Sequence, residues 1–297
     1  MNSEEVKNLA RKLGADLVGV APIERFKDVP AHMHPASILP EAKSIIVVGR
    51  QIVRGALRGI EEGLIIRAYD DFRRMHTITF DYERYGRVQL EDVFIAATVY
   101  DLVCAIENEG YEAVPVFPYP PEAWPQGISV APGRVEPNVH PDPEFAAVAA
   151  GLGEIGYLDM LLTPEFGPRQ RLQLIITEMP LEPDPVYEGK ICDLCMECAD
   201  ICPFSAISRD KRREITIAGK KMIIGEVDYS VCRMCPNGAR PNRFHERGKP
   251  DRIAALCTRT CIAHLEKIGA LKMKFATPFR RRKPQIFDVF GRPIKDE

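Results

Sequence analysis

The chain has 297 residues, of which 45% are hydrophobic and 28% are charged, and its formal net charge is −2. This length allows about two domains, and the composition supports a buried core without an overall bias toward nucleic acid. The nine cysteines sit in a long chain, which excludes a small disulfide-stabilised secreted domain. The chain has no signal peptide, no twin-arginine leader and no apolar run of about 18 residues, so we expect a cytoplasmic protein of a reducing, anaerobic cell with no membrane segment.

The pattern of residues 1–178 predicts helices that alternate with strands. The first helix starts at a capping box formed by Asn2 and Glu5, and Gly14 follows its end. Apolar periodicity predicts further helices over 60–76, 89–109 and 145–150. Short β-branched runs predict strands over 16–21, 44–49, 111–117 and 172–178. Such alternation is typical of a layered fold of the α/β or α+β class.

A proline-rich stretch separates these elements from a glycine segment. Residues 115–143 hold nine prolines, which remove backbone donors and predict a long irregular loop. Gly151, Gly153 and Gly156 then form a G-x-G-x-x-G pattern. Because this pattern follows a helical stretch and no strand, a dinucleotide fold is disfavoured, and a turn that allows close approach is favoured. Residues 179–185 read as a linker.

Eight of the nine cysteines lie between residues 192 and 261. The first four have the spacing C-x2-C-x2-C-x3-C-P, which is typical of bacterial two-cluster ferredoxins. A zinc site is the rival interpretation, but zinc usually pairs two C-x2-C knuckles a dozen or more residues apart. The expected ligands of two 4Fe–4S clusters are Cys192, Cys195, Cys198, Cys202, Cys232, Cys235, Cys257 and Cys261. The ninth cysteine, Cys104, is interpreted as a small buried hydrophobe.

The ferredoxin topology rule also predicts how these ligands divide. The fourth cysteine of the first motif reaches across to the other cluster. The first cluster then takes Cys192, Cys195, Cys198 and Cys261. The second cluster takes Cys202, Cys232, Cys235 and Cys257. Twenty-one residues separate Cys235 from Cys257, and Ile262 stands where a proline would follow Cys261, so the second half of the motif departs from that of a compact ferredoxin.

Four segments together resemble a known family. They are KLGADLVGVAP (12–22), AKSIIVVG (42–49), AAVAAGLGEIGYLDMLLTPEFGPRQRLQLIITEMPLEPD (146–184) and CDLCMECADICPFSAI (192–207). This combination resembles the epoxyqueuosine reductases and reductive dehalogenases, which are cobalamin-dependent iron–sulfur reductases. The likeness spans most of residues 5–262, and the chain looks like a short member without the C-terminal helical-repeat extension.

The resemblance implies a fold and a function. It implies a nitroreductase-like, cobalamin-binding domain over 1–185, a two-cluster ferredoxin domain over 186–271 and a basic tail over 272–297. In the family the clusters pass electrons to the cobalt of a corrinoid for reductive removal of oxygen or halogen. The position of the family's catalytic aspartate falls near Pro137, which is not an acid, and no histidine ligand to cobalt can be assigned here. Neither a queuosine substrate nor a halogenated one is therefore supported.

Candidate residues for the chemistry lie beside the glycine segment. The expected cofactor contacts are Gly151, Gly153, Gly156, Tyr157 and Met160, although a glycine turn packed inside the domain explains them almost as well. The expected proton donors are His140, Asp142 and Tyr82, since a reductive elimination needs a proton near the substrate.

Other functions remain open on the sequence alone. The chain fits a non-catalytic electron carrier, a reductive activator of a corrinoid protein, or a reductase that holds FMN in place of the corrinoid. Its partners are then a small-molecule substrate or a corrinoid protein, and a low-potential donor such as ferredoxin or flavodoxin. The basic residues between 267 and 283 fit a solvated tail, and also an anionic partner such as RNA or an acidic ferredoxin. The oligomeric state is not predicted.

Overall fold

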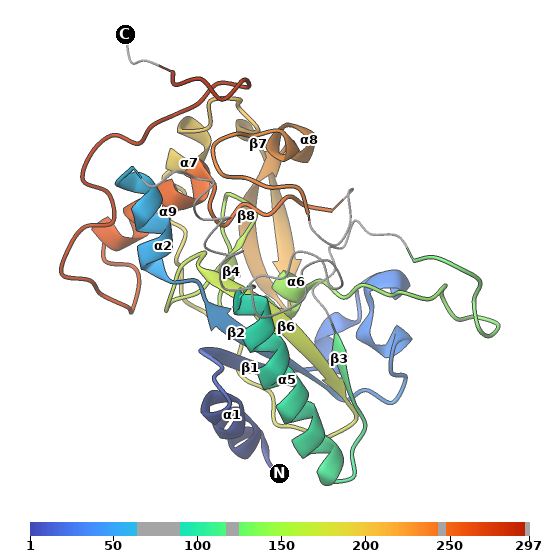
Figure 1. Cartoon of the computed structure of the whole chain (residues 1–297). Helices are drawn as coiled ribbons and strands as arrows, with labels where there is room; N and C mark the ends of the chain where they lie inside the picture. Colours follow the sequence, from blue (N-terminus) through green and yellow to red (C-terminus); the bar gives the residue numbers. More distant parts are fainter. Residues whose placement is uncertain (64–89, 117–124, 243–247, 295–297) are drawn as a thin grey trace, which may run out of the picture.

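The computed structural model describes residues 1–63, 90–116, 125–242 and 248–294 (Figure 1). A four-stranded sheet in the order β1-β2-β6-β3 forms its centre. The strands are β1 (Leu17–Pro22), β2 (Ser44–Gln51), β3 (Ala113–Val116) and β6 (Gln170–Thr177). The four strands predicted before residue 185 are therefore confirmed.

The sheet is buried on both faces. Along β2, Ile46 and Val48 face one core and Ile45 and Val47 face another, as the two-residue period of a strand requires. Helices α1 (Ser3–Lys12) and α5 (Leu90–Asn108) cover the first face, and α6 (Pro143–Ala149) covers the second. The described strands of this sheet pair only antiparallel, so the fold is mixed and of the α+β kind.

Local signals account for most helix ends. The capping box at Asn2 and Glu5 is present, and α5 matches the helix predicted over 89–109. The helix predicted over 60–76 is wrong at its start, because α2 runs over Arg54–Glu61. Gly55 and Gly59 weaken the helical pattern in the sequence, and Gly63, with φ of +107°, follows the end of α2. The rest of the predicted span, from residue 64, lies outside the described residues.

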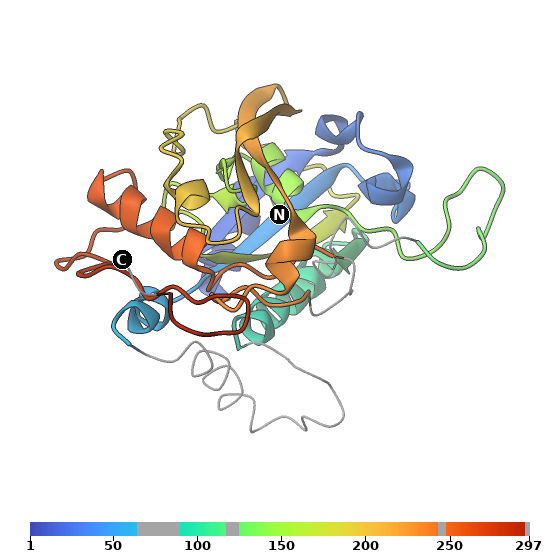
Figure 2. The same ribbon diagram turned by 90° about the horizontal axis from the view of Figure 1, so that it is seen from above.

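Between β3 and α6, the proline-rich stretch is irregular where the structure describes it. Residues 125–142 carry no helix or strand, and Figures 1 and 2 show this loop extending away from the sheet. Short 3-10 turns at η1 (Ile23–Phe26), η2 (Ala31–Met33) and η3 (Pro35–Ser37) lie between β1 and β2. No helix among the described residues combines the length and apolar character that crossing a membrane needs.

The cysteine-rich half is built around a long hairpin that the sequence analysis did not predict. Its strands are β7 (Ile207–Ile217) and β8 (Lys220–Val227). Ala218 and Gly219 join them with φ of 49° and 85°, the conformation of a tight two-residue hairpin turn. The apolar side chains of Ile217 and Met222 pack into the core beneath α6. The hairpin therefore attaches the cysteine-rich half to the central sheet.

Short elements complete this half of the molecule. They are α7 (Glu197–Asp200), α8 (Tyr229–Arg233), α9 (Leu256–Lys267) and the small pair of strands β4 (Glu154–Ile155) and β5 (Leu161–Leu162). A third core takes side chains from both sides of residue 185, among them Leu57, Leu162 and Ile262. The domain boundaries expected at 185 and 271 stay a prediction, as do the nitroreductase-like and ferredoxin descriptions of the two parts.

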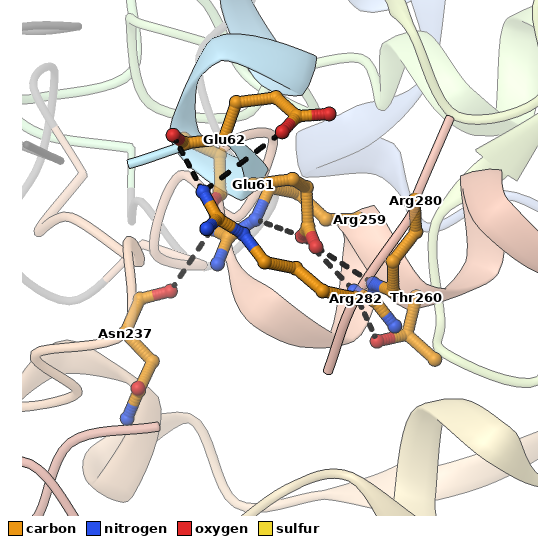
Figure 3. Close-up of polar contacts among 8 residues, drawn as sticks. Glu61, Glu62, Asn237, Arg259, Thr260, Arg280 and Arg282 are labelled. Carbon is orange, nitrogen blue, oxygen red and sulfur yellow. Dashed lines mark hydrogen bonds and ion pairs between the residues drawn. The ribbon is translucent and has the colours of Figure 1, made fainter. Parts of the chain in front are cut away.

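Salt bridges connect α2 to α9 and to the segment around Arg280. Figure 3 shows Glu61 of α2 between Arg259 of α9 and Arg280 of the segment that follows it. Arg54 pairs with Glu266 through two hydrogen bonds of 2.7 Å. The segment predicted as a basic tail thus lies against α2 and α9, at least as far as Arg280.

Candidate functional site

The structure gathers the eight cysteines of the cysteine-rich half into two hollows. One hollow, the first thiol set, is lined by Cys192, Cys195, Cys198 and Cys261. The other, the second thiol set, is lined by Cys202, Cys232, Cys235 and Cys257. These are the two groups that the ferredoxin topology rule predicts, whereas iron–sulfur ligation itself stays a prediction.

The helical segments at α7 and α9 position two thiols of each set. Cys257 and Cys261 lie one turn apart on α9, about 6 Å along the helix axis. Cys198 lies on α7, and Cys202 follows just beyond its end. Each helical segment therefore supplies one thiol to each set, which brings the two hollows side by side.

The loop of the first thiol set is wound tightly. Leu194 and Met196 have φ of 61° and 65°, a left-handed conformation that residues other than glycine adopt rarely. The backbone N–H of Tyr157 donates to the sulfur of Cys192 over 3.4 Å. The carboxylate of Glu154 accepts hydrogen bonds of 2.7 Å from the N–H groups of Ile191 and Cys192. The β4–β5 pair therefore anchors this loop.

Both thiol sets suit a soft, positively charged metal group. Burial, followed by the charges of neighbouring thiols, raises the pKa of Cys198 to about 12. Burial likewise raises the pKa of Cys232 to about 12 and that of Cys195 to about 11. Such thiols are neutral near pH 7 on their own, and the charge of a bound metal deprotonates them. Soft thiolate ligands in fours fit iron–sulfur clusters or zinc.

A cluster of ionisable side chains that the sequence analysis missed lies beside the second thiol set. The Tyr229 hydroxyl donates to the carboxylate of Asp159, and the Lys249 ammonium lies 3.3 Å from that carboxylate. Arg252 donates to the backbone oxygen of Asp159 over 2.8 Å, and its guanidinium lies 5.4 Å from the centre of the Tyr229 ring. Asp159 lies 70 or more positions before the other three residues, so no sequence motif marks the cluster.

The charges of this cluster compensate each other. Burial alone would raise the pKa of Asp159, but the Lys249 charge and the Tyr229 hydrogen bond lower it below its usual value. Burial alone would lower the pKa of Lys249, but the Asp159 carboxylate raises it. Burial raises the pKa of Tyr229. Asp159 and Lys249 are therefore an ion pair at neutral pH, and Tyr229 keeps its proton.

Glu144 lies near this cluster at the start of α6. Burial raises its pKa to about 7, although the Lys249 charge opposes that rise. One carboxylate oxygen accepts a hydrogen bond of 2.9 Å from the N–H of Leu161. A group with a pKa close to neutral exchanges protons readily under physiological conditions. The sequence analysis did not select this residue, because nothing in its local pattern marks it.

The glycines expected to contact a cofactor pack against the chain itself. A side chain at Gly151 would meet the backbone oxygen of Pro185 at 2.1 Å, and one at Gly153 would meet that of Leu162 at 2.0 Å. A side chain at Gly156 would meet a Leu162 methyl at 2.6 Å. These close approaches are a reason for glycine at all three positions.

The other two expected cofactor contacts, Tyr157 and Met160, contact residues of the cysteine-rich half. Tyr157 is 1% exposed, and its hydroxyl donates to the backbone oxygen of Ser208 over 2.8 Å. Met160 is 9% exposed, and its sulfur lies 3.5 Å from the hydroxyl of Thr258. The assignment of these residues and of the three glycines to an organic cofactor stays a prediction.

Two of the three expected proton donors, His140 and Asp142, lie at the end of the proline-rich stretch, just before and at the start of α6. His140 is buried, and its backbone N–H donates to the oxygen of His32 over 3.0 Å. Asp142 is the N-cap of α6 and accepts from the N–H groups of Glu144 and Phe145. Tyr82 lies outside the described residues. The catalytic assignment of all three stays a prediction.

The first thiol set is the one that reaches the surface. Cys195 is exposed, whereas Cys198 is buried. Beside Cys195, the His264 ring bridges two carboxylates, with Nε2 2.8 Å from Asp193 and Nδ1 3.0 Å from Glu197. Several of the basic residues beyond 267 are paired: Lys272 with Glu165, Arg280 with Glu61, and Arg282 with Glu62.

Comparison with known proteins gives relatives of two kinds. A tetrachloroethene reductive dehalogenase of Desulfitobacterium hafniense is 48% identical over 234 residues, which cover 70% of this chain and 39% of the relative. An epoxyqueuosine reductase of Bacillus anthracis is 41% identical over 58 residues, which cover 20% of this chain and 15% of the relative. This chain thus spans about two fifths of the length of the first relative. No model of a known protein family matches the chain.

A solved structure shares the fold. A catabolic reductive dehalogenase superposes with a TM-score of 0.52 at 21% identity, over 87% of this chain and 31% of the other. This shared fold agrees with the sequence relatives that are also reductive dehalogenases. The chain belongs to the family that contains the reductive dehalogenases and the epoxyqueuosine reductases.

Proposed function

We propose that this protein is an iron–sulfur oxidoreductase that passes electrons through two 4Fe–4S clusters to a corrinoid, for reductive chemistry on a small organic substrate. The observation that carries the proposal is the division of eight thiols into two adjacent sets of four. Two cubane clusters need eight thiolate ligands, and shared helices hold the clusters of such proteins close together.

The chain's own residues fit the two clusters. Each set offers four soft donors in a small, largely apolar hollow, which excludes water from the metal group. The N–H of Tyr157 already donates to a ligand sulfur of the first set, as hydrogen bonds in cluster sites commonly do. Free thiols of this kind need reducing surroundings.

A corrinoid, when bound, supplies a strongly reducing cobalt centre for the removal of oxygen or halogen. Among the described residues we assign no contacts to the corrinoid, because the glycine segment packs against the chain itself. The proposal therefore places no residue against the corrinoid. It assigns proton supply to the neighbourhood of Glu144 and Asp142, where a carboxyl group with a pKa of about 7 lies at the start of α6.

We further propose that electrons arrive at the first thiol set. Cys195 is the exposed cysteine among the eight, and electron transfer from a protein donor requires a short path from the surface. The donor class is a small low-potential protein such as a ferredoxin or flavodoxin.

The test is reconstitution of the full chain with iron and sulfide in the absence of oxygen, followed by analysis for iron, sulfide, cobalt and flavin. We expect about eight irons per chain, and a change in the visible spectrum of added hydroxocobalamin. Bound zinc, or about four irons after full reconstitution, would contradict the two-cluster part. Eight irons with no corrinoid binding would contradict the corrinoid part alone.

A non-catalytic electron carrier for a separate corrinoid protein is the second candidate. The close packing of Gly151, Gly153 and Gly156 against the chain favours it, since these positions leave little room for a flat cofactor. In that case the clusters accept electrons from dithionite, the chain binds neither corrinoid nor FMN, and reduced chain transfers electrons to a corrinoid protein. Flavin released on denaturation would instead support an FMN-containing reductase.

A further inference from the structure

A buried arginine lies in the wall of the second thiol set. Arg252 is 3% exposed and lines the same hollow as Cys202, Cys232, Cys235 and Cys257. No arginine or lysine lines the first hollow, where the polar side chains besides the thiols are those of Tyr157, Asp193 and His264. Within the described part of the chain, the two sets therefore differ in the charge placed against them.

The protein provides partners for part of the Arg252 guanidinium. Its Nη2 donates to the backbone oxygen of Asp159 over 2.8 Å, and its charge lies over the ring of Tyr229. Its Nη1 is buried and has no hydrogen-bond partner among the described residues. A buried N–H of a charged group without a partner is costly, so such a group normally meets an acceptor.

The sulfur atoms of a cluster are such acceptors. Four thiolates and a 4Fe–4S core carry net negative charge, and reduction adds one electron without forming or breaking a bond. Positive charge and N–H donors beside the sulfurs stabilise the reduced form more than the oxidised form, and so raise the reduction potential.

We propose that Arg252 tunes the second cluster by directing Nη1 at its sulfurs and by holding a positive charge beside them. The inference rests on the proposed two-cluster function. It makes Arg252 a positioning and electrostatic residue whose effect is to favour electrons on the second cluster. The first cluster, whose hollow Arg252 does not line, is not affected by this residue.

The test is a redox titration of the reconstituted protein followed by electron paramagnetic resonance. Variants Arg252→Met and Arg252→Lys are compared with wild type, and Cys235→Ser identifies the signal of the second cluster. We expect the midpoint potential of the second cluster to fall in Arg252→Met and to fall less in Arg252→Lys, which keeps a charge but loses the planar fork. The midpoint potential of the first cluster stays at its wild-type value.

Arg169→Met is the matched control. Arg169 is also a fully buried arginine, but it donates to the backbone oxygen of Ile52 and lines neither thiol hollow. Both midpoint potentials are expected to stay unchanged in this variant. An unchanged second midpoint in Arg252→Met, or an equal fall in Arg169→Met, overturns the inference.

The outcomes separate the inference from the function on which it rests. Wild type with fewer than about eight irons contradicts the two-cluster function. Eight irons with a second midpoint that does not respond to Arg252 contradicts the inference alone. Where Arg252→Met does not retain iron, Arg252→Lys decides, because an unchanged second midpoint in that variant overturns the inference as well.

Discussion

Glu61 and Arg259 form a buried ion pair, 2.8 Å apart, that joins α2 to α9 across 198 positions of the chain. The two side chains are 2% and 3% exposed. Arg280 adds two further hydrogen bonds to the same carboxylate, of 2.6 and 2.9 Å (Figure 3). Arg259 lies between Cys257 and Cys261, so this pair also holds the helix that serves both thiol sets.

Replacing Glu61 by glutamine should destabilise the protein by about 3 kcal/mol, because the buried Arg259 and the partly exposed Arg280 lose their counter-charge. Urea unfolding of the reconstituted protein measures this difference. Glu62→Gln is the control, since Glu62 is 38% exposed and its ion pairs, of 3.6 Å or more, lie at the surface. Equal stability of the two variants would show that the ion pairs of Glu61 with Arg259 and Arg280 contribute nothing specific.

The same pair gives a dependence of stability on pH. Burial alone would raise the pKa of Glu61, but the hydrogen bonds and charges of Arg280 and Arg259 lower it below its usual value. A carboxyl group with a lowered pKa stabilises the folded state above the pKa of the unfolded chain, and this contribution is lost as the pH falls through the folded pKa. Below about pH 4.5, stability should therefore fall more steeply in wild type than in Glu61→Gln. Parallel acid limbs in thermal unfolding would contradict this assignment.

Glu144 predicts the opposite trend near neutrality. Because its folded pKa is raised to about 7, the folded state holds this proton more tightly than the unfolded chain does. The contribution is fully present below the unfolded pKa and is lost as the pH rises through about 7. Glu144→Gln keeps an oxygen for the N–H of Leu161 and removes the titration.

The measurement is urea unfolding of both proteins between about pH 6 and pH 8. Wild type should lose stability relative to Glu144→Gln over this range, by no more than about 1.4 kcal/mol per pH unit. A constant difference between the two proteins would mean that Glu144 does not titrate there.

The two cysteines of α9 should act on different clusters although they lie one turn apart. Cys261 lines the first hollow and Cys257 the second. We expect Cys261→Ser to change the resonance signal of the first cluster and Cys257→Ser that of the second. Cys104→Ser, outside both sets, should leave both signals and the iron content intact. The division fails if both α9 variants alter the same signal.

The glycine segment gives a prediction about stability. In Gly153→Ala the new methyl group would lie 2.0 Å from the backbone oxygen of Leu162, so β4 and β5 must move apart. We expect a loss of about 2 kcal/mol or more in urea unfolding. Gly55→Ala is the matched control, because nothing lies within 4 Å of the added group and the residue is exposed on α2.

That control should be neutral or more stable by up to about 1 kcal/mol, as alanine favours a helix. If Gly153→Ala unfolds like wild type, the segment has free space, and the assignment of Gly153 to a cofactor wall gains support.

The sequence by itself determined the features that local spacing encodes. The capping box at Asn2 and the four strands of the sheet follow from side-chain periodicity and turn residues, which act over a few positions. The two groups of cysteines follow from ligand spacing together with the ferredoxin topology rule. Gly55 and Gly59 obscured the start of α2, and the β7–β8 hairpin was missed because its exposed middle is charged and resembles a loop.

Only the tertiary structure decided which distant residues meet. Asp159, Tyr229 and Arg252 come from three separate segments, and Glu61 lies about two hundred residues from Arg259. Within its own segment of the sequence, each of these polar side chains looks like that of an ordinary surface residue. Their burial and pairing arise when the β4–β5 pair, α2 and α9 pack together, because a charge removed from water requires a partner that only the folded chain brings near.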